Sequence, residues 1–459
     1  MGLPSALVLI ASAFAISHYV PGSFAAPASE TDLFLTPFIK SGDLAKARES
    51  SMDSMKLSDV KSDKNIISYS GYFTIDEAKH SNLFFWFFPA ENNPDKAPVI
   101  LWINDLPGFT TLKGVFLETG PCYVDDDNQL RDRNTSWAKT HSMLYIDAPV
   151  GTGFSFADSE DAYANSSEEE SEELYEALKQ FFTLYSDFQP NDFYLAGESY
   201  AGTTIPDFAK KIDDENDKGS FKINLKGLIM GAPFLDLSQV HEEDFYYSLG
   251  LISAKQRKEF TEAHTKIYDL HKAGKDAEAI QHGLSLHIGP DSLTSKMTGF
   301  RDTHSALTTV DPPQLGKFVK FIDSKEAHRY LHTGVHKFIS ANKVVFKHFG
   351  SDVFRQHTKT LEGLLNRGYR SLIFIGQFDI YVPPDKLEEV VFNLKWDKAN
   401  EFAEAPRNVW RVNGDVAGYV QSIGSFAYAV VRNAGNYVIQ DQPEWTTDLL
   451  EKFIAGKGF

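Results

Sequence analysis

The sequence predicts an α/β protein with a central, mostly parallel mixed sheet, helices on both faces and a mainly helical insertion. Three observations support this fold class. Short apolar runs that suit buried strands alternate with a segment of helical spacing, one strand ends in a Gly-x-Ser turn that opens a helix, and a long stretch rich in charge and histidine separates the first strands from the last. At 459 residues the chain has room for one large α/β domain with a sizeable insertion, or for two domains.

The N-terminus carries an apolar run, Ala6 to Ile16, followed by a small-x-small pattern that ends at Ala25. The run is too short to cross a bilayer, so it predicts a secretory signal peptide over residues 1–25, although no Lys or Arg precedes it. A buried N-terminal segment is the alternative. Asn134 and Asn165 each begin a glycosylation triplet, which fits a secreted chain.

Composition narrows the classes of partner and compartment. A formal net charge of -18 repels phosphate backbones, so we expect no nucleic acid partner. No later apolar stretch is long enough to span a membrane. The single cysteine, Cys122, excludes an intramolecular disulfide, so the stability of the chain must come from its core.

The first part of the chain predicts a hairpin and two buried strands. Thr36 to Ser51 has the character of a short surface helix that begins at Ser41 or Asp43. Ser68 to Thr74 with Asn82 to Phe88 predicts an antiparallel hairpin at a sheet edge. Pro98 to Ile103 and Met143 to Asp147 are apolar on both faces, as in strands covered from both sides. We interpret Asp147 as the anchor of the loop that follows it.

A helix predicted over Glu168 to Phe188 leads into the stretch with the clearest chemistry. The strand Phe193 to Ala196 runs into Gly197-Glu198-Ser199-Tyr200-Ala201-Gly202, a form of the nucleophile elbow, in which small residues let a serine project above the end of a strand. Ser199 is therefore the candidate nucleophile, although a structural turn with an N-cap serine has the same pattern. Phe221 to Gly231 predicts the next strand, and strand–helix–strand order is typical of a parallel sheet.

Charge and histidine are dense beyond Asp236. We predict a mainly helical insertion over residues 236–350 that covers the carboxyl edge of the sheet, where ligands of open α/β sheets bind. The core then comprises residues 26–235 and 351–459. Its second part predicts three strands and a final helix, at Ser371 to Gly376, Asn408 to Asn413, Ala427 to Arg432 and Pro443 to Ile454.

Three histidines of the insertion, His328, His332 and His336, fall at i, i+4 and i+8 of one predicted helix. No nearby Asp, Glu or Cys completes a ligand set, so we interpret them as a solvated face. The sequence predicts no metal site and no cofactor.

Five stretches of the chain together resemble the serine carboxypeptidases, and most closely their vitellogenic-type branch. They are LWINDLPGFTT from Leu101, YIDAPVGTGFSF from Tyr145, the elbow GESYAG, GQFDIYV from Gly376, and AGNYVIQDQP from Ala434. These enzymes are secreted or lysosomal and remove C-terminal residues from peptides. The likeness runs in order from about Thr36 to the end, and it implies the α/β-hydrolase fold.

The resemblance implies Ser199 as the nucleophile and Asp379 as the carboxylate that would orient a histidine. Asn436 occupies the position of that histidine, and all fourteen histidines lie at or before His357. A serine hydroxyl needs a base to remove its proton, and an amide cannot accept a proton at accessible pH. The chain therefore lacks the base that the family's reaction requires. Ser199 and Asp379 are then structural leftovers.

The resemblance also implies an oxyanion hole and a carboxylate-binding subsite, and both are altered. The backbone N–H groups of Tyr200 and Leu106 are the implied oxyanion donors, but the family has glycines where this chain has Asp105 and Leu106. Asn104 and Glu198 would hold the terminal carboxylate of a peptide, or equally would form a structural hydrogen-bonded pair. Asp105 beside them disfavours an anionic ligand unless protons are shared at acid pH.

We therefore expect a secreted or lysosomal serine-carboxypeptidase homologue that has lost or nearly lost peptidase activity. It would act by binding a peptide or protein, or as a structural, storage or accessory protein. An active acid carboxypeptidase, with Asp379, the substrate or a histidine of the insertion as base, is the alternative; an acyltransferase would need the same Ser–His pair. Cys122 has no evident base and is disfavoured as a nucleophile. The oligomeric state stays open, a homodimer included.

Overall fold

The computed structural model describes residues 32–56, 65–103, 106–219, 221–236, 239, 241–310 and 314–459. The predicted signal peptide lies outside these residues, and so do Asn104 and Asp105. Within the described part of the chain, no helix is both long enough and apolar enough to cross a membrane.

An eleven-stranded mixed sheet organises the fold, with the strand order β1-β2-β3-β7-β4-β8-β9-β10-β13-β12-β11. The run from β7 to β13 is parallel, and the strands at both ends pair antiparallel. The strands are β1 (Met52–Lys56), β2 (Asn65–Asp76), β3 (Ser81–Phe88), β4 (Val99–Ile103), β7 (Ser142–Ile146), β8 (Phe193–Glu198), β9 (Leu225–Gly231), β10 (Arg370–Gly376), β11 (Arg407–Val412), β12 (Asp415–Ile423) and β13 (Phe426–Val431), with a separate hairpin of β5 (Cys122–Val124) and β6 (Leu130–Asp132).

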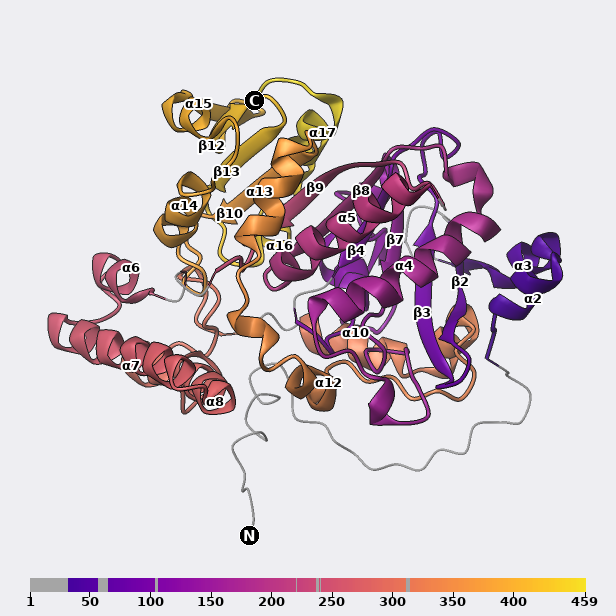
Figure 1. Ribbon diagram of the computed structural model, residues 1–459, viewed down its shortest axis with the longest axis horizontal. Coiled ribbons are helices and arrows are strands. Elements are labelled where there is room, and N and C mark those ends of the chain that lie inside the picture. The colour runs from indigo at the N-terminus through magenta and orange to yellow at the C-terminus, as the bar shows by residue number, and fades with distance from the viewer. Residues whose placement is uncertain are drawn as a thin grey trace, which may run out of the picture.

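Helices cover both faces of this sheet, and Figure 1 shows α4, α5 and α13 lying across one of them. The helices of the core are α2 (Thr36–Ser41), α3 (Leu44–Ser51), α4 (Ser167–Leu184), α5 (Ala201–Lys218), α13 (Thr358–Asn366), α14 (Pro384–Phe392), α15 (Ala399–Glu404), α16 (Val438–Asp441) and α17 (Pro443–Ala455). Two large apolar clusters result, one on each face, because β4 and β7 are buried on both sides. The fold class predicted from the sequence is confirmed.

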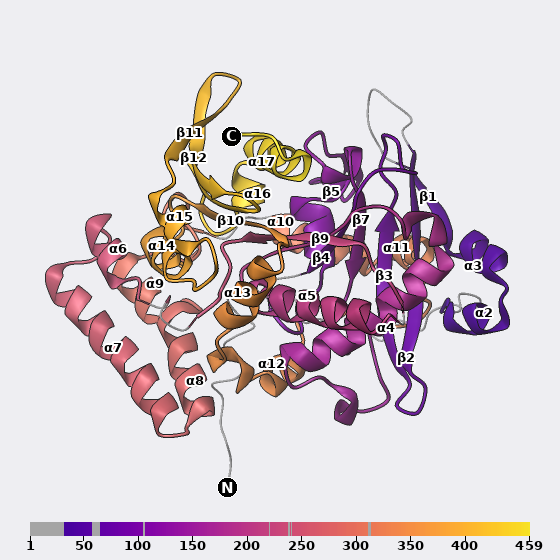
Figure 2. The ribbon, with the colours of Figure 1, turned by 45° about the horizontal axis from the view of Figure 1, so that its top comes forward.

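The chain between β9 and α13 forms α6 (Glu243–Ser248), α7 (Ala254–Lys272), α8 (Asp276–His287), α9 (Leu293–Thr298), α10 (Gln314–Ile322), α11 (Lys325–Leu331) and α12 (Lys343–His348). Helices α6 to α9 lie beside the core (Figures 1 and 2), whereas α10 and α11 pack on one face of the sheet through Phe318, Ile322 and Leu331. The pair α7 and α8 packs through Ile267, Ala279 and Leu286 and extends away from the sheet.

The predicted surface helix is present as α3, which begins after Asp43 as expected, whereas Thr36–Ser41 forms a separate helix, α2, because Gly42 adopts a left-handed φ of 80° that ends it. One prediction about the N-terminal region is wrong. The β2–β3 hairpin is not at the sheet edge, since β1 pairs with the outer side of β2.

His328, His332 and His336, which were expected on one solvated helix face, instead contact residues of the core. Helix α11 ends at Leu331, and His332 takes a left-handed φ of 54°. The His332 imidazole Nδ1 lies 2.8 Å from Ser70 Oγ, and the His336 ring stacks on Phe156 at 3.7 Å between centroids. Tertiary packing against β2 and the loop after β7 therefore overrides the helical spacing.

Candidate active site

Ser199 directly follows the carboxyl end of strand β8, and its backbone is left-handed, with a φ of 59°. The backbone around it holds this turn: Ser199 N–H donates to Gly231 O at 2.8 Å, and Ser199 O accepts from Gly202 N at 3.0 Å and from Phe234 N at 2.9 Å. A Cβ at Gly197 would lie 2.4 Å from the Ile103 carbonyl oxygen, so the small residue before the serine is a steric requirement of the elbow.

The Ser199 side chain lines a mostly apolar cavity of about 120 Å³, together with Leu106 and Tyr200. Helices α7, α8 and α12 supply its other wall through Ile267, Ile280, Leu284 and Phe346. His287 and Tyr381 also line it, and the sequence analysis missed both. Tyr381 could have been predicted as a site residue, because it lies two residues after Asp379 in the sequence. No feature of the sequence around His287 indicates that it lines this cavity.

Asp379 lies in the turn after β10, fully buried, and accepts three hydrogen bonds. Its Oδ1 accepts from Tyr381 N at 2.9 Å and Val382 N at 2.8 Å, and its Oδ2 accepts from Asn436 Nδ2 at 2.8 Å. Burial raises the pKa of Asp379 to about 7, against the lowering effect of these bonds and of His304. Asp379 and Asn436, the residue at the histidine position of the family, are thus in contact, and the Asn436 amide donates the hydrogen bond between them.

One histidine of the chain between β9 and β10 lies next to Asn436 but is directed elsewhere. Asn436 N–H donates to the backbone oxygen of His304 at 2.9 Å. The His304 ring stacks on Tyr437 at 5.1 Å between centroids, and its Nδ1 lies 3.3 Å from Asp302 Oδ1. No histidine among the described residues hydrogen-bonds to the Ser199 hydroxyl.

Glu198 is 1% exposed at the end of β8, and its Oε1 accepts a 3.4 Å hydrogen bond from Ile439 N. This bond ties the elbow to α16, next to Asn436. Together with Phe374, Glu198 leaves no room for a side chain at Gly231, because a Cβ there would lie 2.7 Å from Phe374 Cζ and 2.9 Å from Glu198 Cγ. Its role in binding a peptide carboxylate stays a prediction, since Asn104 and Asp105 lie outside the described residues.

Asp147 anchors the loop that follows it, as predicted, through Phe154 N, and it also holds the loop after β4 through Thr110 and Thr111. Its Oδ1 accepts from Thr110 Oγ1 at 2.7 Å and from Thr111 N at 2.8 Å, and its Oδ2 accepts from Phe154 N at 3.0 Å. Burial raises its pKa to about 6 despite these bonds. Gly153 takes a φ of 59°, and a Cβ there would lie 1.9 Å from Asp147 Oδ2.

The remaining predicted residues lie away from the elbow. Asn134 and Asn165 are both exposed, and the Asn165 amide donates to Glu169 Oε2 at 3.0 Å. Cys122 is fully buried in the apolar cluster that contains Trp102. A thiol in that position has no access to a substrate.

The family profile described as "Serine carboxypeptidase" matches residues 59–456. The chain is 39% identical to "Venom serine carboxypeptidase" of Apis mellifera over 433 residues, covering 93% of this chain and 91% of that protein. It is 35% identical to "Probable serine carboxypeptidase CPVL" of Homo sapiens, covering 93% and 90%, and 34% identical to "Vitellogenic carboxypeptidase" of Aedes aegypti, covering 92% and 89%.

Among solved structures, the prohormone-processing carboxypeptidase KEX1(delta)P from Saccharomyces cerevisiae matches with a TM-score of 0.76 at 21% identity. The match covers 89% of this chain and 96% of that one. At this identity the likeness shows the fold, which is the α/β-hydrolase arrangement of a large, mostly parallel sheet with helices on both faces.

Proposed function

Since this chain belongs to the serine carboxypeptidase family, we propose that it is a member whose peptidase activity is lost or nearly lost and that acts by binding a peptide or protein. The observation that carries the proposal is the 2.8 Å hydrogen bond from Asn436 Nδ2 to Asp379 Oδ2. An amide makes the bond that an imidazole N–H would make, and it offers no lone pair basic enough to take the proton of Ser199.

The size of the expected defect follows from the role of the base. Loss of the triad base in another serine hydrolase lowers turnover by a factor on the order of 10⁶, or about 8 kcal/mol of barrier. Asp379 cannot replace the base through Asn436, because its oxygens are occupied by the Asn436 amide and two backbone N–H groups. Binding and the oxyanion donors would leave only trace activity.

The cavity supports the binding half of the proposal. Leu106, in place of a family glycine, lies beside Ser199 and Tyr200 in the cavity wall, where a substrate carbonyl would sit. The apolar side chains of α7, α8 and α12 suit an apolar ligand side chain. We therefore assign Tyr200 and Leu106 as the altered oxyanion region and Glu198, with Asn104 and Asp105, as the altered carboxylate subsite.

The compartment is part of the same proposal. A signal peptide over residues 1–25 and glycosylation at Asn134 and Asn165 would place the protein in the secretory pathway, outside the cell or in the lysosome. The exposed positions of both asparagines support modification there. Release of N-linked glycans from the secreted protein by an endoglycosidase, with Asn134→Gln and Asn165→Gln as controls, tests the assignment.

An active acid carboxypeptidase is the competing function, and a labelling experiment separates the two. We expect the purified protein to react with an active-site fluorophosphonate no faster than its Ser199→Ala variant, and to release no amino acid from blocked dipeptides at acid or neutral pH. Labelling of Ser199 with turnover that Ser199→Ala abolishes would refute the proposal.

Repair of the site tests the same reasoning in the opposite direction. Asn436→His combined with Asp105→Gly and Leu106→Gly restores the family residues, and we expect it to raise esterase turnover by roughly 10²- to 10⁴-fold over the unrepaired chain. Addition of Ser199→Ala to the repaired chain is the matched control and should remove the gain. A correctly folded triple variant without activity would mean that the assigned residues do not form the site.

A further inference from the structure

A second cluster of chemically active side chains lies in the helices between β9 and β10, and one of its members, His287, also lines the Ser199 cavity. Glu242 immediately precedes α6, His264 lies in α7 and His287 is the last residue of α8. His264 Nε2 lies 3.1 Å from Glu242 Oε1, and His287 Nε2 lies 3.4 Å from the same oxygen. All three residues are buried, Glu242 and His264 completely.

These contacts are not ordinary hydrogen bonds. Neither carboxylate oxygen of Glu242 and neither ring nitrogen of His264 has a hydrogen-bond partner of acceptable geometry among the described residues. A buried carboxylate that lacks such partners is costly, because it has given up its hydration without replacement. The cluster therefore groups buried donor atoms within 4.8 Å of one another, and the ion pairs among them leave the hydrogen-bonding capacity of Glu242 and His264 unused.

The spacing of the donor atoms fits a tetrahedral metal ion. Ligand bonds of about 2.0 to 2.1 Å at tetrahedral angles place neighbouring donor atoms roughly 3.3 Å apart. The two nitrogen-to-oxygen separations, 3.1 and 3.4 Å, lie on either side of that value, and all three donor atoms lie within 4.8 Å of one another. We propose that Glu242, His264 and His287 bind a divalent zinc ion, with a water molecule or the second Glu242 oxygen in the fourth position.

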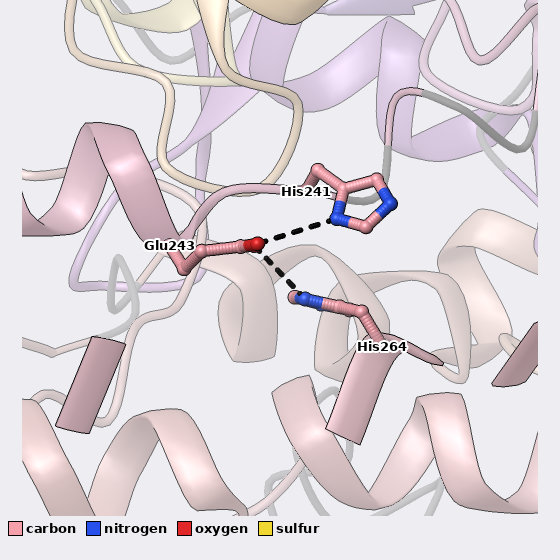
Figure 3. A group of neighbouring side chains, drawn as sticks. All are labelled: His241, Glu243 and His264. Atoms are coloured by element: carbon pink, nitrogen blue, oxygen red, sulfur yellow. Dashed lines mark hydrogen bonds and ion pairs between the residues drawn. The ribbon is translucent and has the colours of Figure 1, made fainter. Parts of the chain in front are cut away.

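A neighbouring carboxylate orients the central ligand from its far side. His264 Nδ1 lies 3.0 Å from Glu243 Oε2 (Figure 3), and Nε2, on the other side of the ring, lies 3.1 Å from Glu242 Oε1. Figure 3 also shows His241 directed at the same carboxylate, whose Oε1 lies 3.3 Å from His241 Nδ1 and accepts from Thr261 Oγ1 at 3.1 Å. A carboxylate on the outer nitrogen fixes the tautomer of a metal-bound histidine and raises its basicity.

The same contacts decide which of two candidate groups takes the ion. His241, Glu243 and His264 also lie within 4.8 Å of one another, but the Glu243 oxygen that faces His241 already accepts two hydrogen bonds. Glu242 has none. Glu242 is therefore the ligand, and Glu243 is a positioning residue.

The ion would join three helices that no disulfide can join, since Cys122 is the single cysteine of the chain. His287 also forms part of the cavity wall beside Ser199, so the ion would lie directly behind that wall. The zinc site would hold α6, α7 and α8 together and fix the side of the cavity that they form.

Zinc binding to the purified full-length protein tests the proposal. After chelator treatment at neutral pH, we expect the protein to take up one zinc ion per chain, by mass spectrometry of metal content and by calorimetric titration, and to melt at a higher temperature with zinc than without. Glu242→Gln and His287→Ala should each abolish binding and the shift in melting temperature. His271→Ala is the matched control, because His271 lies in α7 and pairs with Asp276 at the surface.

Two further measurements keep the test decisive. Glu243→Ala should weaken zinc binding by roughly 10- to 100-fold without abolishing it, as expected of an outer carboxylate. If Glu242→Gln or His287→Ala fails to fold, cobalt substitution in the unmodified protein replaces it, and the visible bands of a tetrahedral site with nitrogen and oxygen ligands are expected. A folded protein that binds neither metal, or variants that bind zinc as the unmodified protein does, would overturn the proposal.

Discussion

Replacement of Asp379 by asparagine should change how stability depends on pH. The folded chain holds the proton of this buried carboxyl up to about pH 7, whereas the ordinary pKa is 3.8. Between these values the folded state binds more protons than the unfolded state, so this group lowers the free energy of unfolding as the pH rises. A shift of about 3 units at 1.36 kcal/mol per unit amounts to roughly 4 kcal/mol, lost from about pH 4 to about pH 7.

The Asp379→Asn variant removes the titration but keeps the shape of the side chain. Its amide oxygen can still accept from Tyr381 N and Val382 N, and the bond from Asn436 is lost by an amount that does not depend on pH. Relative to the unmodified protein, the variant should therefore gain up to about 4 kcal/mol between pH 4 and pH 8.

Urea denaturation of both proteins across that pH range measures the difference directly. Ser199→Ala, which removes no titrating group, should follow the pH dependence of the unmodified protein. His304 acts on the Asp379 charge, so His304→Gln is measured alongside as a second comparison. Parallel curves for Asp379→Asn and the unmodified protein would refute the reasoning, because they would mean that Asp379 ionises in the folded chain as it does in the unfolded one.

Two further changes test packing around the site, both by urea denaturation. Gly153→Ala should cost about 3 kcal/mol or more, because the new Cβ would lie 1.9 Å from Asp147 Oδ2 at a left-handed φ of 59°; a loss under about 0.5 kcal/mol would contradict the packing described for that loop. Arg355→Met should cost about 2 kcal/mol, because the buried Asp207 carboxylate loses its ion pair with Arg355 and keeps only His357 Nδ1 at 3.3 Å as a cationic partner. The cost is less than for a fully buried pair because the Arg355 side chain is 31% exposed. An unchanged stability at low salt would contradict the second prediction.

The parts of the fold that the sequence predicts well are those where one local signal decides the structure. The strand β4 was expected from an apolar run between turn formers, and both of its faces are buried. Strand β1, with the sequence MDSMK, has no apolar run or alternation that would predict a strand. It forms by pairing antiparallel with β2, so tertiary context decides its structure. Strand β12 was missed because Gly418 interrupts its pattern, yet glycine is required there, since a Cβ would lie 2.1 Å from the Val430 oxygen.

The same distinction applies to the site. Ser199, Asp379 and Asn436 stand in contiguous motifs, so the sequence could name them, and the structure places Asn436 against Asp379. The cluster of Glu242, His264 and His287 has no motif, because its members come from three helices and meet only through tertiary packing. Metal-ligand motifs with short spacing in the sequence identify sites whose ligands lie on one helix or loop. The ligands of this cluster lie far apart in the sequence, so no such motif marks it.

The left-handed turn at Ser199 is secured by the three main-chain hydrogen bonds of that residue, to Gly231, Gly202 and Phe234, and none of them involves its hydroxyl. The left-handed backbone conformation at residue 199 is thus fixed by the surrounding main chain, and it should persist with any small side chain at that position. A non-glycine residue there carries a conformational strain of roughly 1 to 2 kcal/mol. In a chain that no longer uses Ser199 as a nucleophile, this strain lowers stability without serving catalysis. Ser199→Gly should therefore raise the free energy of unfolding and leave the affinity for ligand unchanged.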